Sequence, residues 1–304
     1  MNGIININKP QNKTSFSVVA AVKRITGEKH TGHAGTLDPL ATGVLPVCLG
    51  QATRVIEYLF DETKTYRSEV ELGIATDTYD VTGRVVRTGD TSNIQLETIE
   101  EALAAFRGTI LQTPPMYSAV KYCGKPLYRL ARSGIEVERK SRPAHIYSLE
   151  IVDWQPPVVT LEIVCGKGTY IRSLAHDLGE RLGCGAQMKS LVRTKVGPFS
   201  IEDALTLSEV EESFQMGNGE QCLYPADYVL ASFPALVVNK EQQCLLCHGS
   251  PIDSKLDQGT GPSDIKPGQF SRAYTGDGNF LGMVRYEADL RWHPEKIFLK
   301  GCCG

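Results

Sequence analysis

The chain has 304 residues, of which 41% are hydrophobic and 22% are charged, and its formal net charge at pH 7 is −3. These values exclude a disordered or fibrous chain and are typical of a globular protein with one large domain and a smaller one. The first residues, MNGIININKP, lack the basic and apolar runs of an export signal, and no later stretch is apolar enough to span a membrane. We therefore expect a cytoplasmic protein without a membrane partner.

Charge is distributed unevenly along the chain. The stretch 107–195 contains 14 Lys or Arg against 7 Asp or Glu, whereas the stretch 201–227 contains seven acids and no Lys or Arg. A basic region of this kind is suited to a polyanion. A solvated charged face gives the same pattern, so charge alone leaves nucleic-acid binding open.

The first part of the chain contains both strand and helix patterns. GIININ predicts a strand that ends at Lys9-Pro10, and Thr14 or Ser15 caps a helical pattern that stops at Gly27. Further along, VLPVCLG and KTYRSEVELG are strand patterns, and LETIEEALAAF is an amphipathic helix.

The middle of the chain predicts two paired strands and a helix. HIYSLEIVDW and VVTLEIVCG alternate with period two around Pro156-Pro157, which indicates an antiparallel pair, and TYIRSLAHDLGERLG is helical. Strands and helices do not alternate regularly enough for a doubly wound parallel sheet. We therefore predict an α+β domain with a mainly antiparallel or mixed sheet.

The composition changes after about Ser200. GNGEQCLYPAD is loop-like and is expected to act as a linker. From about Phe233 the chain is rich in Gly and Pro and contains short strand-like runs, ALVVN, FSRAY and FLGMVRY, with GDGNFLG as a hairpin turn. This pattern predicts a compact, mostly β appendage.

The segment GHAGTLDPLATG, from Gly32 to Gly43, predicts a shaped loop around one carboxylate. Its three glycines and one proline are costly in both helices and strands. Asp38, held between Leu37 and Pro39, is positioned by backbone, which is the preorganisation that an active site needs. Asp-Pro is also a common turn initiator, so the loop by itself does not decide between the two roles.

Four segments of the chain resemble one family of RNA-modifying enzymes. They are GHAGTLDPLATGVLPVCLGQATR, KTYR, QTPPMYSAVKYCGKPLYRLARSG and GKGTYIRSLAHDLG. These motifs resemble those of the TruB-type tRNA pseudouridine synthases, bacterial enzymes that isomerise the uridine at position 55 in the T loop of tRNA. The resemblance covers about residues 3–200, and the tail resembles the PUA-like domain of the same enzymes.

This resemblance implies a fold, a domain plan and a reaction. It implies a pseudouridine synthase domain over residues 1–228, with an RNA-clasping insertion at about 107–145, and a PUA-like RNA-binding domain over residues 229–304. The reaction breaks a C1′–N1 bond and forms a C1′–C5 bond without net oxidation or hydrolysis, so no cofactor and no metal is expected. The implied partner is the T arm of tRNA, with no protein partner and a monomeric state.

The resemblance also implies three catalytic residues. Asp38 matches the catalytic acid of the family, Arg172 matches the residue that pairs with it, and Tyr66 matches the residue that stacks on the target base and takes part in removing the C5 proton. A permanent guanidinium charge favours the ionised carboxylate, which burial alone would disfavour. The sequence does not decide whether Asp38 attacks covalently or removes a sugar proton.

Further residues are implied to bind RNA. A base in a folded loop must leave its stack before it reacts, and His33 matches the family position that fills the vacated space. Tyr170 and Asp80 match residues at the same pocket, although a capping role for Tyr170 and a turn-forming role for Asp80 are equally compatible with their positions. Four cations match the RNA-clasping insertion: Lys121, Lys125, Arg129 and Arg132.

Lys9-Pro10 matches the first motif of the family, where support of the catalytic loop is a more fitting role than chemistry. The family commonly has Gly soon after this pair, and this chain has Asn12. Asn tolerates a positive φ better than other non-Gly residues, so we expect the turn to be preserved.

Two other classes of function are compatible with parts of the sequence. A tRNA-binding folding chaperone would use the basic surface and His33 without needing Asp38. The protein subunit of a guide-RNA-dependent pseudouridine synthase would contain a related catalytic domain. The set Asp38, Tyr66 and Arg172 favours catalysis over binding alone, and the bacterial type of insertion favours a stand-alone enzyme.

The segment CLLCH, from Cys244 to His248, fits the pattern of c-type haem attachment. Such attachment needs export, and no second C-x-x-C at zinc-finger spacing supports a zinc site. A helix of the appendage is the favoured interpretation. The nine cysteines are scattered and odd in number, so a disulfide framework is not expected.

Overall fold

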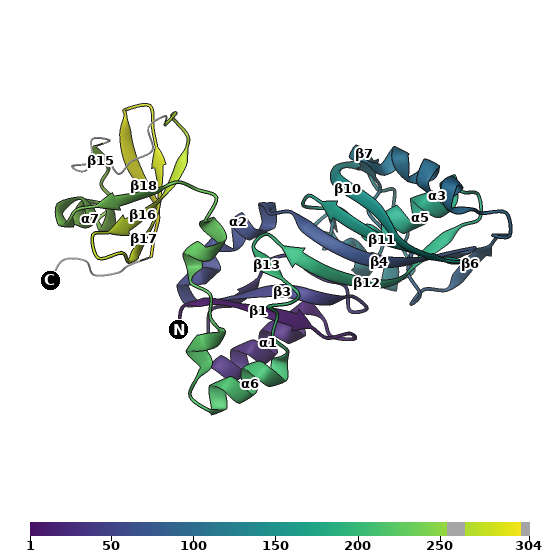
Figure 1. Ribbon diagram of the computed structural model, residues 1–304, viewed down its shortest axis with the longest axis horizontal. Helices are drawn as coiled ribbons and strands as arrows, with labels where there is room; N and C mark the ends of the chain where they lie inside the picture. Colours follow the sequence, from purple (N-terminus) through teal and green to yellow (C-terminus); the bar gives the residue numbers. More distant parts are fainter. Residues whose placement is uncertain (254–264, 299–304) are drawn as a thin grey trace.

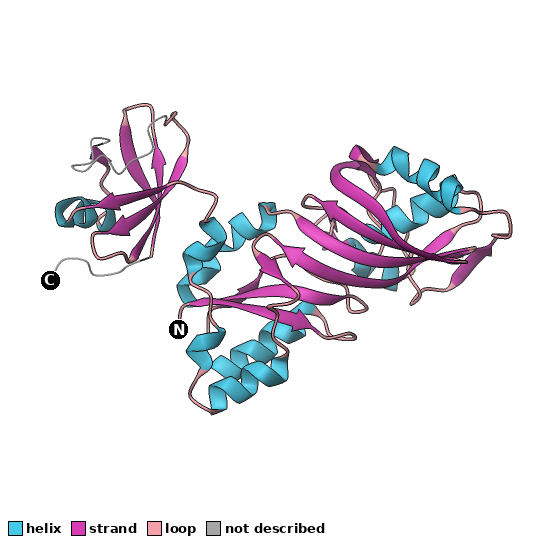
Figure 2. Cartoon of the chain, viewed as in Figure 1, coloured by secondary structure: helices cyan, strands magenta, loops and turns pink. Residues whose placement is uncertain are grey.

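The computed structural model describes residues 1–253 and 265–298. A large α+β unit carries a smaller β unit at one end, so that the molecule is elongated (Figure 1). Strands dominate both units, and helices cover parts of the larger sheet (Figure 2). The predicted α+β class with a mainly antiparallel or mixed sheet is confirmed. No helix within the described ranges is long and apolar enough to cross a membrane.

The larger sheet has nine strands among the described residues. Seven of them follow the order β1-β3-β12-β4-β11-β10-β7, while β2 pairs with β3 and β13 with β12. Only the β12–β3 pair is parallel. The bounds are β1 Gly3–Lys9, β2 Thr31–His33, β3 Thr42–Leu49, β4 Lys64–Leu72, β7 Gly108–Gln112, β10 Arg142–Gln155, β11 Val158–Cys165, β12 Ala186–Val196 and β13 Phe199–Ser200.

Helices pack against this sheet in two places. Near the N-terminus, α1 (Ser15–Thr26) lies beside α6 (Leu207–Gln215), and α3 (Leu96–Leu103) lies beside α5 (Ile171–Arg181) at the other end (Figure 1). The start and stop signals of α1 are as predicted, because Thr14 accepts a hydrogen bond from Ser17 N and Gly27 ends the helix in the left-handed region. The short helix α2 (Ile56–Asp61) and the 3-10 helices η1 (Gly50–Val55) and η2 (Ala104–Phe106) complete this part.

The main core lies between the sheet and α5. Alternate residues of β4, including Tyr66, Val70 and Leu72, face Leu174 and Leu178 of the helix. This is the period-two face that the sequence predicts for residues 64–73. Tyr66 is therefore placed where the apolar face of the sheet meets the start of α5.

Two excursions leave the sheet. The first is the pair β5 (Ile74–Thr76) and β6 (Val85–Thr88). The second falls within the basic insertion and consists of the hairpin β8 (Lys121–Tyr122) and β9 (Lys125–Pro126), followed by α4 (Leu127–Arg132). Cys123 and Gly124 form the hairpin turn with φ of 47° and 80°, as a two-residue turn requires.

The described residues of the smaller unit form a five-stranded sheet with the order β14-β16-β17-β18-β15 and one helix, α7 (Lys240–Cys247). Its strands are β14 Ala235–Val238, β15 Ile252–Asp253, β16 Phe270–Thr275, β17 Phe280–Tyr286 and β18 Arg291–Ile297. The three runs predicted as strands and the hairpin turn at GDGNFLG are confirmed. The sequence did not predict β18, since RWHPEKI is mostly polar and contains a proline; Trp292 is the residue that anchors it in the core.

The predicted linker at residues 217–227 is wrong. Tyr224 exchanges two backbone hydrogen bonds of 2.8 Å with Ile4 at the edge strand β1, and Cys222 is buried. The segment holds the 3-10 helix η3 (Gly219–Cys222), and η4 (Ala226–Leu230) follows it. An unpaired edge offered hydrogen-bond partners that loop-like composition does not reveal.

The two units share an apolar cluster. Met283 of β17 belongs to the same cluster as Val196 and Phe199 of the larger unit. Polar contacts surround it: Arg54 donates to the carbonyl of Ile297, and Lys296 forms an ion pair with Glu57.

Candidate active site

The predicted loop around Asp38 lies between two strands. Gly32 and His33 belong to β2, and Thr42 and Gly43 begin β3, so only residues 34–41 lie outside strands. The loop is thus shorter than its sequence suggests, because its ends continue the sheet.

Gly43 is required at the end of the loop. Its φ is 102°, and a Cβ there would lie 2.2 Å from the carbonyl oxygen of Arg193. The two residues are partners in the only parallel pair of the sheet, β12–β3. The close approach of these backbones fixes where the loop leaves the sheet.

Three residues, from the end of β1 to the first turn of α1, hold the loop on both sides of Asp38. The Ser15 hydroxyl accepts a hydrogen bond from Leu37 N at 2.9 Å and donates one to Leu37 O at 3.2 Å. The backbone N–H of Asn12 and the Lys9 ammonium both donate to the carbonyl of Pro39. The predicted positive φ of Asn12 is confirmed, at 63°.

Lys9 is fully buried and makes no ion pair with Asp38 in this arrangement. Its ammonium also donates to the carbonyls of Pro10 and Lys13, so it ties the first turn to the loop. The pKa of Lys9 is lowered to about 8, chiefly by burial. The negative charge of Asp38 raises this pKa, and the positive charge of Arg193 lowers it. These contacts are those of a supporting residue.

Asp38 and Arg172 form a two-point ion pair. Arg172 Nε lies 2.9 Å from Asp38 Oδ2, and Arg172 Nη2 lies 3.1 Å from Asp38 Oδ1. The Arg172 side chain is 6% exposed and that of Asp38 is 36% exposed. The Asp38 carboxylate is therefore held by a buried guanidinium group and is still partly accessible to solvent.

The remaining donors of Arg172 are also used. Its guanidinium donates to Thr78 O at 3.3 Å and to Tyr117 O at 2.8 Å, and Nη1 lies 3.6 Å from Asp80 Oδ2. Asp80 is buried, and its other oxygen accepts from Thr78 and Thr82 within its own turn. Asp80 thus shapes its own turn and also faces the guanidinium group of Arg172.

The charge of Asp38 is set by opposing influences. Burial raises the pKa of its carboxyl group, Arg172 lowers it, and the nearby carboxylate of Asp80 raises it. The pKa of Asp38 lies above the ordinary 3.8 as a result. The ion pair with Arg172 is what favours the ionised form in this partly closed position.

The first turn of α5 is anchored to β7. Gln112 accepts a hydrogen bond from Tyr170 N at 3.0 Å and donates to Tyr170 O at 3.2 Å, and Ser173 donates to Thr113 O. An unpaired N–H at the start of the helix is satisfied in this way. Tyr170 lies at the N-cap position, and burial raises the pKa of its hydroxyl.

Tyr66 lies on β4 with 9% of its surface exposed, beside Arg193 of β12. Burial raises the pKa of its hydroxyl, whereas the Arg193 guanidinium lowers it. His33 is half-buried at the other end of the loop, and burial together with the Arg193 charge lowers its pKa, which favours the neutral ring. Its Nδ1 is buried and has no hydrogen-bond partner among the residues that the structure describes.

Arg193 was missed in the sequence. Its fully buried guanidinium donates to Val44 O at 2.7 Å and to Gly35 O at 3.0 Å, so it connects the two ends of the loop. In the alternating strand 186–196 it has the parity of the buried Leu191. A cation on the inward face of a strand is the signal that could have identified Arg193.

A stacked pair lies behind the Arg172 site. The rings of Tyr79 and His176 are 4.0 Å apart and nearly parallel, and Tyr79 has a φ of 66°. This conformation turns the Thr78 carbonyl and the Asp80 carboxylate toward the same guanidinium. A bulky residue at positive φ is strained, and the stack offsets part of that strain.

The basic residues of the insertion lie apart from these contacts. Lys121 and Lys125 extend from the hairpin and Arg129 and Arg132 from α4, all with exposed side chains. The insertion reaches Arg172 through the carbonyl of Tyr117, which accepts a hydrogen bond from the guanidinium group.

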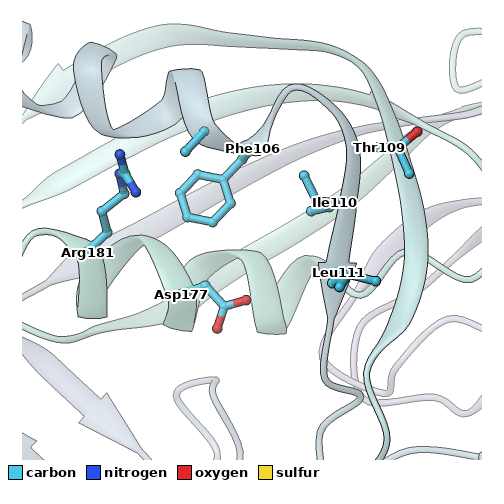
Figure 3. Close-up of a pocket in the computed structure, with 7 residues that line it drawn as sticks. Phe106, Thr109, Ile110, Leu111, Asp177 and Arg181 are labelled. Carbon is cyan, nitrogen blue, oxygen red and sulfur yellow. The ribbon is translucent and has the colours of Figure 1, made fainter.

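A cavity of about 370 Å³ lies elsewhere, between α5, β7 and η2 (Figure 3). Asp177 and Arg181 of α5 face Phe106 and Ile110 across it, and burial raises the pKa of Asp177 to about 6. None of the predicted site residues lines this cavity. Cys244 and Cys247 lie on α7, and within residues 1–253 and 265–298 no group of three metal-ligating side chains is close enough to hold an ion.

Comparison with family models and known proteins identifies the family of this chain. Residues 23–171 match the N-terminal domain of TruB family pseudouridylate synthase, and residues 172–231 match the C-terminal domain of tRNA pseudouridylate synthase B. The tRNA pseudouridine synthase B of Dehalococcoides mccartyi is 45% identical, over 99% of this chain and 98% of that protein. The enzyme of the same name from Clostridium tetani is 44% identical, over 93% and 95%.

Solved structures show the same fold. One chain in the crystal structure of a Cbf5-Nop10-Gar1 complex has a TM-score of 0.75 and 27% identity, over 98% of this chain and 85% of that chain. The family implied by the motifs around Asp38 is thus confirmed by the family models and by the curated relatives. The chain belongs to the TruB family of pseudouridylate synthases.

Proposed function

We propose that this protein converts uridine to pseudouridine in tRNA, at position 55 of the T loop, with Asp38 as the catalytic carboxylate. The observation that carries the proposal is the two-point contact between Arg172 and Asp38, with distances of 2.9 and 3.1 Å, at a carboxylate that is 36% exposed. The names of the relatives support the activity and the tRNA substrate.

Asp38 acts on the sugar of the flipped nucleotide, as nucleophile or as base. The C1′–N1 bond breaks, the uracil turns, the C1′–C5 bond forms, the C5 proton leaves and N1 gains a proton. The reaction is balanced without an oxidant or a metal. Arg172 holds the carboxylate ionised and oriented, and a planar fork suits both tasks.

Tyr66 faces the base and His33 fills the space that it leaves. A neutral, half-buried imidazole is suited to stacking among unpaired bases, since it enters the RNA without a charge that needs solvation. Tyr170 and Asp80 complete the pocket, and Lys9 supports the loop. Flipping costs roughly a few kcal/mol, which contacts outside the pocket must offset.

Lys121, Lys125 and Arg129 of the insertion at about 107–145 supply such contacts to phosphates. Residues 1–228 form the catalytic domain in this proposal, and residues 229–304 form a PUA-like domain that adds RNA affinity. The enzyme acts without a protein partner. Identity of 45% with tRNA pseudouridine synthase B, against 27% with the chain of the Cbf5-Nop10-Gar1 complex, favours the stand-alone enzyme over a guided one.

Release of tritium from C5 of uridine in a transcribed T-arm RNA tests the proposal, because forming the C1′–C5 bond expels that hydrogen. We expect release by the unaltered protein without added metal or nucleotide, and none by Asp38→Asn, which retains RNA binding. Asp61→Asn is the matched control, since Asp61 is an exposed acid that pairs only with Lys167 among the described residues.

Binding without release by the unaltered protein would contradict the proposal and favour an RNA chaperone. Release that continues in Asp38→Asn would show that the carboxylate is structural.

A further inference from the structure

Phe16 is the most exposed of the large hydrophobic side chains in the described part of the chain. It is 80% exposed, ahead of Leu111 at 74% and Met216 at 73%. Single exposed hydrophobic residues are common, so exposure alone carries no argument. Its position in the molecule does.

Phe16 is adjacent to the residues that hold Asp38. Its neighbour Ser15 makes both hydrogen bonds to Leu37, and Asn12, four residues before Phe16, binds the Pro39 carbonyl. Both residues that flank Asp38 in the chain are therefore held by the segment that carries Phe16. The ring lies in the first turn of α1, on the solvent side, while Ser15 and Val18 face inward.

Lys13, three residues before the ring, carries a positive charge. Lys13 is exposed and has no carboxylate within ion-pair distance among residues 1–253 and 265–298. Helix α1 contains no acid, and its last turn carries Lys23 and Arg24. Arg24 is only 3.9 Å from Glu211 of α6, so that end is partly neutralised, whereas the end with Phe16 and Lys13 is not.

We propose that Phe16 and Lys13 form a binding site for an unpaired nucleotide of the substrate RNA, next to the nucleotide that enters the catalytic pocket. The Phe16 ring stacks on the base and the Lys13 ammonium contacts the phosphate. Phe16 and Lys13 are three residues apart and both exposed, and proteins bind unpaired RNA by combining an aromatic ring, on which any base can stack, with a cation for the phosphate. This inference rests on the proposed function, because the occupant is its RNA substrate.

The site has an energetic role. Flipping one uridine unstacks its neighbours, and a ring that accepts a neighbouring base stabilises the opened loop. Because the same turn holds Leu37 and Pro39, the contact positions the RNA relative to Asp38 without touching the reacting atoms.

Two measurements on the full-length protein test the inference. The first is the Kd for a fluorescent T-arm RNA, and the second is the single-turnover rate of tritium release at saturating RNA. We expect Phe16→Ala to raise Kd about 5- to 100-fold, the range seen when a stacking aromatic is removed. The rate at saturation should remain within about twofold of the unaltered protein.

Conservative and control variants separate stacking from folding. Phe16→Tyr keeps the aromatic ring and should leave Kd unchanged. Phe16→Leu keeps only the apolar volume and should raise Kd. Met216→Ala removes a similarly exposed apolar side chain at the end of α6 and should change neither quantity. Lys13→Gln should reduce the slope of log Kd against log salt concentration by about 0.7 to 0.9.

An unchanged Kd in Phe16→Ala would overturn the inference, as would a lower saturating rate with unchanged Kd, because the residue would then act through the loop. Equal loss in Phe16→Tyr and Phe16→Ala would also overturn it. If the unaltered protein binds the RNA but releases no tritium, the proposed function fails, and the Kd series still tests the stacking site.

Discussion

At the scale of single residues, Arg172 is the most connected group of the site. It is nearly fully buried, and its donors meet two carboxylates and two carbonyls. A buried cation that is satisfied in this way is rigid, and removal of its fork leaves several acceptors without a donor.

Arg172→Lys is expected to slow the chemical step about 10- to 100-fold at saturating RNA. A lysine keeps the charge but provides one point of contact instead of a planar fork, a loss of about 1.5 to 3 kcal/mol. The rate of tritium release in a single turnover measures the chemical step. Arg67→Lys on the exposed side of β4 is the control, and equal rates in the two variants would show that the fork is unnecessary.

The dependence of kcat/KM on pH should report the ionisation of Asp38. The pKa of this group is raised, chiefly by burial, so activity should be lost as the pH falls through a value above 3.8. Asp80 is one cause of the increase, so Asp80→Asn should move the acid limb of the profile to lower pH. A limb that moves upward in this variant would refute the assignment.

At the scale of secondary structure elements, the loop depends on the close contact of β3 and β12. Gly43→Ala places a Cβ against the Arg193 carbonyl at 2.2 Å. We expect a loss of about 3 kcal/mol or more in the free energy of unfolding, measured by urea denaturation.

Gly27→Ala is the matched control for this substitution. Gly27 also has a positive φ, of 68°, but no atom lies within 4 Å of the position of its Cβ. The expected cost is about 1 kcal/mol. If both variants lose the same stability, the strain is in φ and the contact with Arg193 is irrelevant.

The sequence predicted the elements better than their pairings. The period-two pattern of β4 and the capping residues of α1 were sufficient to predict these two elements, because both signals lie within the elements themselves or next to them in the sequence. The order of β12 between β3 and β4 could not be predicted, since pairing depends on residues more than a hundred positions apart. For the same reason Asp38 and Arg172 were joined by family resemblance, and Arg193, which no motif singled out, was missed.

At the scale of the whole molecule, the smaller unit is both separate and attached. It has its own core around Trp292, yet Met283 completes a cluster of the larger unit. Removal of the smaller unit therefore exposes apolar surface without cutting the main sheet.

A chain that ends at Ser232 is expected to keep the catalytic pocket, with a lower melting temperature and a higher Kd for T-arm RNA. Single-turnover release at saturating RNA should remain within a few-fold of the full chain. Circular dichroism shows whether the shortened chain is folded, and a thermal melt gives its melting temperature. Unfolding of the shortened chain at 25 °C would contradict this division of the molecule.

The position of β12 has a consequence for synthesis of the protein. Asp38 and Arg172 are separated by 134 residues, and the strand that lies between β3 and β4 is the last long strand of the sheet to leave the ribosome. Contacts at such separations form slowly, because the intervening chain must lose its freedom first. Until residue 196 has emerged, β3 and β4 lack the neighbour that joins them. The pair of Asp38 and Arg172 thus assembles late, after α1 and β1 have already formed.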